Sequence, residues 1–229
     1  LEDKMVQDPE KVEKFINQIA EDSKMKGKQE YALLQEIKRD EMPEDNAYLV
    51  ENWESAYYIN KLKAEKFLYD PLAVRPYFQY NKVKDGIMNL ASEIFSVRFE
   101  KMEEKQVWHG SVDVYNVIDV ETENRLGRIF LDMHPREGKF KHAAQTGLRR
   151  GVKGRQLPEG VLMCNFPDPN ETQGAGFMEH DQVKTFFHEF GHLLHHILGG
   201  NQKWIRFSGV ATEWDFVEAP SQLLEEWVI

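Results

Sequence analysis

Apolar residues recur at helical spacing through the first hundred positions of the chain. The first stripe, over residues 12–19, follows Asp8-Pro9, a capping residue and a proline suited to the first turn of a helix. Gly27 is the expected end of this helix, and a proline ends the third because the residue before a proline avoids helical geometry. We therefore predict helices over residues 9–27, 28–40, 45–69 and 81–95.

The period changes after Lys105. Residues 112–120 alternate and are rich in β-branched side chains, and a polar turn separates them from a second such run at 125–133, which predicts a β-hairpin. Glycines punctuate residues 138–160, where we expect no long element. The apolar run Val161–Phe166 predicts another strand, whose exposed edge could pair with an extended peptide.

Residues 180–199 predict a largely buried helix, capped by Asp181 and ended by two glycines. The helix contains the run HEFGH. His188 and His192 are four residues apart, so both imidazoles lie on one face and can reach one metal ion. Glu189 is rotated by about 100° from His188, beside the metal, where it can hold a water molecule and take its proton. The motif also arises by chance, at roughly a few per cent, and a catalytic zinc needs a third protein ligand.

The third ligand must come from a short set of downstream acidic residues. Thr212-Glu213 resembles a capping box, so a second helix is predicted there, with a kink at Pro220. Glu218 has apolar neighbours on both sides, and a buried carboxylate needs a partner such as a metal. We expect Glu213 and Asp215 to stabilise the N-terminus of that helix through its dipole. We expect Glu225 and Glu226 to lie on a solvated face.

Composition narrows the class of protein. The 229 residues are 41% hydrophobic and 30% charged, with a net charge of −10 that argues against nucleic acid as a partner. A single cysteine, Cys164, fits a reducing compartment. There is neither a secretory apolar segment at the start nor an apolar run of 18 residues, so we expect a soluble, cytoplasmic protein without membrane contact. All eight histidines follow residue 108, and five of them lie within positions 180–196.

With these residues in this order, the chain resembles the thimet oligopeptidase family of zinc metallopeptidases. HEFGHLLHH is followed by DFVEAPSQLLEEW, with His192 and Glu218 26 positions apart. Further segments occur in family order, so the resemblance covers most of the chain: LAVRPYF at 72–78, WH at 108–109, LD at 131–132, REGK at 136–139 and HDQV at 180–183.

The resemblance implies a fold, a site and an activity. The fold is α+β and predominantly helical, with a zincin-like catalytic region of a small β-sheet and the HExxH helix. Residues 1–105 would be the helical region, and 106–229 the zinc-peptidase catalytic region, truncated at its C-terminal side. One Zn²⁺ ion would be bound by His188, His192 and Glu218, with Glu189 as general base. The implied substrates are short peptides, and the oligomeric state is left open.

Two departures accompany the resemblance. Zinc peptidases often place an aspartate one turn after the glutamate ligand, but this chain has Gln222, so a histidine ligand could be oriented by Asp215, Glu213 or backbone. Family members also continue beyond the glutamate ligand, into helices whose Tyr and His residues stabilise the oxyanion, so this chain reads as an internal fragment. A part-built zinc- or peptide-binding module without turnover and a metal-free polar core are the alternatives. We expect His195 and His196 to be packed or solvent-facing.

Overall fold

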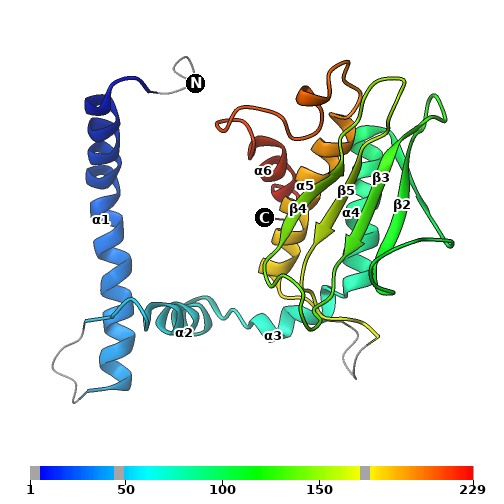
Figure 1. Ribbon diagram of the computed structural model, residues 1–229. Helices are drawn as coiled ribbons and strands as arrows, with labels where there is room; N and C mark the ends of the chain where they lie inside the picture. The colour runs from blue at the N-terminus through cyan, green and yellow to red at the C-terminus, as the bar shows by residue number, and fades with distance from the viewer. Residues whose placement is uncertain (1–5, 44–48, 171–175, 229) are drawn as a thin grey trace. The chain divides into compact units, whose positions relative to one another are not determined.

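The computed structural model describes residues 6–43, 49–170 and 176–228 (Figure 1). Helices and a small mixed sheet give the predicted α+β class. The chain divides into two compact units, Leu1–Asp70 and Pro71–Ile229. Within the described residues, none of the helices is long and apolar enough to cross a membrane.

The first unit contains two helices, α1 (Pro9–Glu41) and α2 (Ser55–Phe67). Asp8 caps α1 by accepting a hydrogen bond of 3.0 Å from the Glu10 amide, as predicted. The expected end at Gly27 is wrong, because α1 is a single helix of 33 residues that ends at Glu41 and includes the second helix expected over 28–40. A glycine in an exposed helix interior costs only about 1 kcal/mol, which the helix-forming residues on both sides outweigh. The expected start of the third helix at residue 45 lies outside the described residues.

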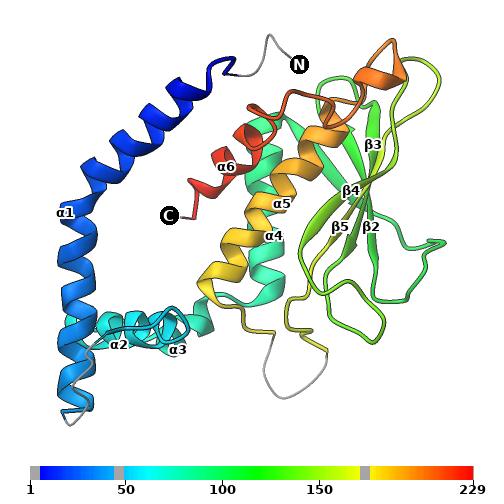
Figure 2. The same cartoon turned by 60° about the vertical axis from the view of Figure 1, so that its left-hand side comes forward.

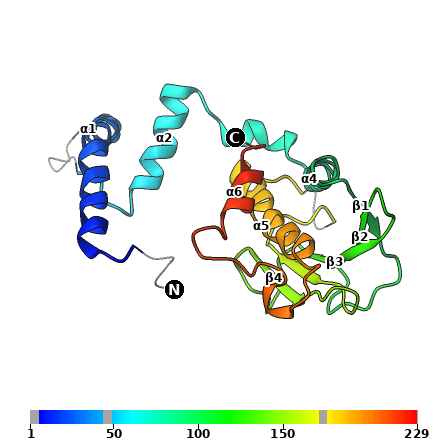
Figure 3. The same ribbon diagram turned by 90° about the horizontal axis from the view of Figure 1, so that it is seen from above.

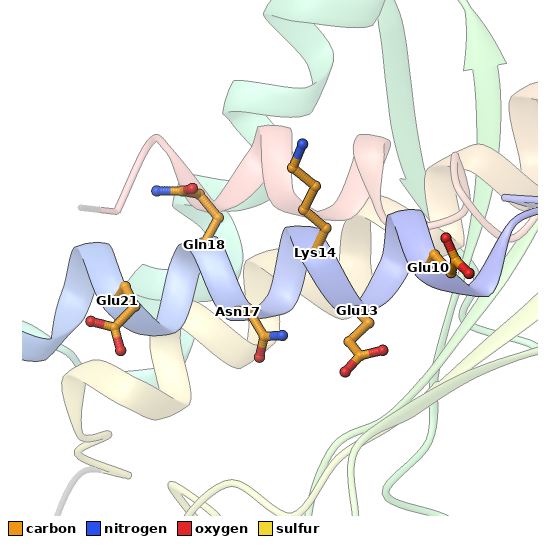
Figure 4. Close-up of a pocket in the computed structure, with 6 residues that line it drawn as sticks. All are labelled: Glu10, Glu13, Lys14, Asn17, Gln18 and Glu21. Atoms are coloured by element: carbon orange, nitrogen blue, oxygen red, sulfur yellow. The ribbon is translucent and has the colours of Figure 1, made fainter.

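The surface of α1 carries the predicted apolar stripe, but the stripe is exposed. Val12, Phe15, Ile16 and Ile19 are 39–65% accessible. Polar side chains project from the neighbouring faces of the same turns (Figure 4). The small core of this unit lies further along the chain and is formed by Ile37, Val50 and Tyr58.

The second unit is built on a five-stranded sheet in the order β1-β2-β3-β5-β4. The strands are β1 (Val97–Lys101), β2 (Asp113–Asp119), β3 (Arg125–Asp132), β4 (Ala144–Arg149) and β5 (Glu159–Met163). The predicted hairpin is the antiparallel pair β2–β3, whereas β3 and β5 are parallel. The strand expected at Val161–Phe166 is β5, which lies between β3 and β4, so the expectation of an exposed edge there is wrong. The open edges belong to β1 and β4.

Strands β1 and β4 were not predicted from the sequence. The glycines around β4 indicated a loop, but Gly147 is required by packing rather than by a turn. A Cβ at this position would lie 2.5 Å from Cε1 of His196, so the absence of a side chain lets the strand approach the helix that carries the histidines. β4 therefore lies beside that helix at the edge of the sheet.

Helices α4 (Tyr80–Phe95) and α5 (His180–Leu198) pack on one face of the sheet (Figure 3). α5 fills the centre of the core with fully buried side chains, among them Phe186, Phe190 and Leu193. Short helices α3 (Pro71–Val74), η2 (Arg75–Tyr77), η3 (Ile205–Phe207) and α6 (Ala219–Glu225) complete the unit. α4 thus shares one core with the sheet. The functional division at residue 105 stays a prediction.

A buried carboxylate joins Trp108, 24 positions earlier in the chain, to two basic residues of the loop that follows β3. Asp132, at the end of β3, accepts hydrogen bonds from Trp108 Nε1 at 2.8 Å and from Arg136 at 2.6 and 2.8 Å. Lys139 Nζ lies 2.9 Å from the same carboxylate and donates to the backbone carbonyls of Asp132 and His134. Burial alone would raise the pKa of Asp132, but these donors hold it far below its usual range. The network anchors the loop that leads into β4.

Candidate metal centre

Helix α5 presents the two histidines of the HExxH run to the same side. Its start is set by a capping box between Glu179 and Gln182, so the cap is Glu179 and not Asp181 as predicted. Phe186 and Phe190 face the sheet, while His188 and His192 are partly buried on the side that faces α6. Their rings are edge-to-face with centroids 4.9 Å apart.

Helix α6 lies beside α5 (Figure 2) and begins immediately after Glu218. The helix expected to start at Thr212 therefore begins later in the chain, at Ala219, and ends at Glu225. Pro220 occupies its first turn, where the missing N–H has no intrahelical partner to lose, so the expected kink is absent from this described helix. Gly191 allows the close approach: a Cβ there would lie 2.7 Å from Ser221 Cα.

Three potential ligand atoms converge between the two helices. Glu218 Oε2 lies 3.3 Å from His188 Nε2 and 3.1 Å from His192 Nε2. The two Nε2 atoms are 3.2 Å apart. The structure therefore brings together all three residues that the resemblance implied as ligands, one of them 26 positions from its neighbour in the chain.

These distances fit a tetrahedral zinc ion. With zinc–ligand bonds of about 2.0–2.1 Å, two ligand atoms of a tetrahedral site are about 3.3 Å apart. Two imidazole nitrogens and one carboxylate oxygen are the donor set of several catalytic zinc sites, which keep a fourth position open. Without a cation or proton between them, two nitrogen lone pairs and a carboxylate would repel one another at this distance.

Glu225, which the sequence placed on a solvated face, contacts the first histidine. Its Oε1 lies 2.5 Å from His188 Nδ1, and its Oε2 lies 3.1 Å from Lys184 Nζ. Burial would raise the pKa of Glu225, but the hydrogen bonds from His188 and Lys184 lower it below its usual value. The contact to His188 thus comes from Glu225 rather than from Asp215 or Glu213. The spacing of seven residues from Glu218, two helical turns, was the signal available in the sequence.

Ser221 contacts the glutamate of the site. Its hydroxyl, fully buried, lies 2.9 Å from the Glu218 carbonyl oxygen and 2.9 Å from Glu218 Oε2. Glu218 itself is half exposed, with 50% of its side chain accessible. The serine therefore restrains a carboxylate that is otherwise open to solvent.

Glu189 lies beside the three-atom cluster and reaches the edge of the sheet. Its Oε2 accepts a hydrogen bond of 2.8 Å from the backbone N–H of Gln145 in β4. This contact could not be predicted from the sequence, because β4 was not predicted. Glu189 is partly buried.

His195 and His196, near the end of α5, are packed, one of the two placements expected for them. His196 is buried and its Nε2 lies 3.1 Å from the Arg149 carbonyl oxygen and 3.0 Å from that of Glu159, so it ties α5 to β4 and β5. His195 is partly buried, and burial, followed by the neighbouring His192 and His196, lowers its pKa. The other acidic residues weighed as ligands, Glu213, Asp215 and Glu226, are exposed.

Comparison with known proteins gives a consistent family. Saccharolysin of Saccharomyces cerevisiae is 34% identical over 241 residues, which cover 99% of this chain and 34% of the yeast protein. Oligopeptidase A of Escherichia coli is 33% identical, covering 98% of this chain and 33% of that protein. Dipeptidyl carboxypeptidase of Escherichia coli is 28% identical, covering 98% and 32%.

The chain thus spans about a third of the length of the curated relatives it matches. The model of peptidase family M3 matches residues 1–229, the whole sequence. This confirms the family expected from the two motif runs. The chain belongs to peptidase family M3.

Proposed function

We propose that this chain carries the zinc site of a metallopeptidase that hydrolyses short peptides. The observation that carries the proposal is the convergence of His188, His192 and Glu218 at 3.1–3.3 Å, a separation that suits one tetrahedral zinc ion. Membership of peptidase family M3 supports peptides as the substrate class.

Glu189 is the proposed general base. Zinc, when bound, would supply Lewis acidity that polarises the scissile carbonyl and acidifies the attacking water. Glu189 takes a proton from this water at its carboxylate and passes it to the leaving amine nitrogen. The hydrogen bond from the Gln145 amide supports this role, because it holds the carboxylate beside the cluster.

Strand β4 offers a place for the substrate. Its outer edge is unpaired within the described sheet, and an extended peptide can add to such an edge through main-chain hydrogen bonds. The Gln145 amide, which contacts Glu189, belongs to this strand. A peptide aligned along β4 would therefore pass close to the proposed base.

The relatives are about three times as long as this chain, so its own turnover is a separate question from its site. We infer from the family resemblance that oxyanion donors lie in sequence beyond Glu218. Loss of one such donor typically costs about 3–4 kcal/mol, or roughly 10²–10³ in rate. We therefore expect slow hydrolysis by these 229 residues.

Cytoplasmic location is also proposed, supported by the single cysteine, Cys164.

An internally quenched short peptide tests the proposed base. We expect zinc-dependent cleavage that disappears in Glu189→Gln while the zinc content is retained. Glu226→Gln is the matched control, because Glu226 is an exposed glutamate of the same unit. An unchanged rate in Glu189→Gln would remove Glu189 from the mechanism. Zinc binding without any cleavage by the unaltered chain would instead favour the non-catalytic binding module.

A further inference from the structure

The carboxylate of Glu225 is held between two side chains of α5. Its Oε1 meets His188 Nδ1 at 2.5 Å, and its Oε2 meets Lys184 Nζ at 3.1 Å. Lys184 lies one turn before His188 on the helix, and only 15% of the Glu225 side chain is accessible. Both carboxylate oxygens are therefore committed, and the group has little freedom to leave the histidine.

This contact determines which nitrogen of His188 carries a proton. An ionised carboxylate only accepts hydrogen bonds, so Nδ1 must donate, and in the neutral imidazole the lone pair is then on Nε2. Nε2 is the atom that faces Glu218 and His192. The tautomer set by Glu225 is thus the one that can bind a metal between the helices.

We propose that Glu225 is a positioning residue that holds His188 in the Nδ1–H tautomer and fixes the direction of its Nε2 lone pair. The expected effect on zinc affinity rests on the proposed zinc site, whereas the tautomer of His188 does not depend on it. Glu218 is the N-cap residue of α6 and Glu225 is its last residue, so one short helix positions both a ligand and the support of another ligand. Other zinc peptidases often place an aspartate one turn after the glutamate ligand; here Gln222 occupies that position, and the residue that contacts His188 is Glu225, two turns after Glu218.

The competing interpretation is that Glu225 only pairs with Lys184 and so ties α6 to α5. Lys184→Met separates the two, because it removes the ion pair and leaves the contact to His188 in place. Glu225→Gln keeps the size of the side chain and an oxygen that can accept from Nδ1, but loses the charge. Glu225→Ala removes the acceptor, and Glu226→Gln serves as the control on the neighbouring exposed glutamate.

Two measurements on the full 229-residue chain test the proposal. Imidazole ¹⁵N spectra of the metal-free protein report the tautomer of His188, assigned by comparison with His188→Gln. Competition with a chromogenic chelator gives the zinc dissociation constant. We expect an Nδ1–H signature in the unaltered chain, Lys184→Met and Glu226→Gln, and its loss in Glu225→Ala. Loss of such outer partners weakens metal binding by about 10–100-fold, so we expect that range for Glu225→Ala and a smaller effect for Glu225→Gln.

The outcomes separate this proposal from the zinc site itself. An unchanged tautomer in Glu225→Ala, or unchanged zinc affinity in both Glu225 variants, would overturn the positioning role. If Glu225→Ala does not fold, Glu225→Gln decides by the zinc dissociation constant, and an affinity equal to that of the unaltered chain would overturn the positioning role. If the unaltered chain binds no zinc, the proposed function fails, and the ¹⁵N spectra still show whether Glu225 sets the tautomer.

Discussion

Gly191 in α5 packs directly against Ser221 in α6. A Cβ on Gly191 would lie 2.7 Å from Ser221 Cα and 2.9 Å from the Pro220 carbonyl oxygen, and both are backbone atoms. The glycine between the two histidines therefore sets how closely α6 approaches α5. Glu218 reaches His192 at 3.1 Å because of this approach.

Gly191→Ala should push α6 away from the histidines. Overpacking of this kind typically costs about 1–3 kcal/mol of stability, and a metal site tolerates ligand displacements of only about 0.5 Å. We expect the zinc dissociation constant to rise by about tenfold or more, measured by chelator competition. Gly86→Ala is the control, because a Cβ there would meet nothing within 4 Å. Equal zinc affinity in Gly191→Ala and the unaltered chain would contradict the role of this close approach.

Ser221→Ala should loosen Glu218 without disturbing the fold. The lost hydroxyl lies 2.9 Å from the Glu218 carboxylate, and a hydrogen bond to a charged group contributes about 1.5–3 kcal/mol. We expect zinc affinity to fall on the order of tenfold, measured by titration calorimetry. Ser92→Ala provides the comparison, since Ser92 Oγ donates to the Met88 carbonyl of its own helix, away from the three ligands. A zinc affinity equal to that of Ser92→Ala would show that Ser221 does not restrain the ligand.

Asp132→Asn should change how the free energy of unfolding depends on pH. The pKa of Asp132 is depressed in the folded protein, so its contribution is present above the unfolded pKa of about 3.9 and is lost as the pH falls through the folded value. Arg136 and Lys139 would lose their charged partner, which typically costs about 3–5 kcal/mol at neutral pH. Urea unfolding at pH 7, 4 and 2 should show this deficit nearly unchanged between pH 7 and 4 and smaller at pH 2.

Asp85→Asn is the control for that series, because Asp85 is exposed on α4. Its unfolding curves should follow those of the unaltered chain at all three pH values. A deficit in Asp132→Asn that is as large at pH 2 as at pH 7 would contradict the buried charge network as its cause.

Substitutions of the two consecutive histidines near the end of α5, His195 and His196, should have opposite effects on the stability of the protein. His196→Ala leaves the carbonyls of Arg149 and Glu159 without their buried partner, so we expect a loss of about 2–4 kcal/mol with zinc stoichiometry unchanged. His195→Leu should be neutral or stabilising. Its Nδ1 is buried without a hydrogen-bond partner among the described residues, and the side chain borders an apolar cavity of about 510 Å³. Equal thermal midpoints for the two variants would contradict this contrast.

Residues close in sequence were the part of the site that could be predicted. His188, Glu189 and His192 follow from helical spacing alone, and Glu218 needed the family resemblance because a tertiary contact brings it to them. Glu225 was placed wrongly, since a run of acidic residues near a helix end resembles a solvated surface. Its true environment depends on Gly191, which brings α6 against α5.

The fold shows the same limit. The β2–β3 hairpin follows from its two apolar runs and the polar turn between them, and α4 follows from its helical periodicity. β4 could not be predicted in this way: its exposed edge position gives no alternating pattern, and its glycine is explained only by the His196 ring. The Gly27 error has a similar origin, because one unfavourable residue does not end a helix whose neighbours all favour it.

The convergence of His188, His192 and Glu218 predicts that these three residues bind one zinc ion. Elemental analysis of the chain, purified without chelator and dialysed against trace zinc, tests it most directly when run beside the double variant His188→Ala/His192→Ala. We predict about one zinc per chain for the unaltered protein and none above background for the variant. Absence of zinc from the unaltered chain, or equal zinc in both proteins, would contradict the account.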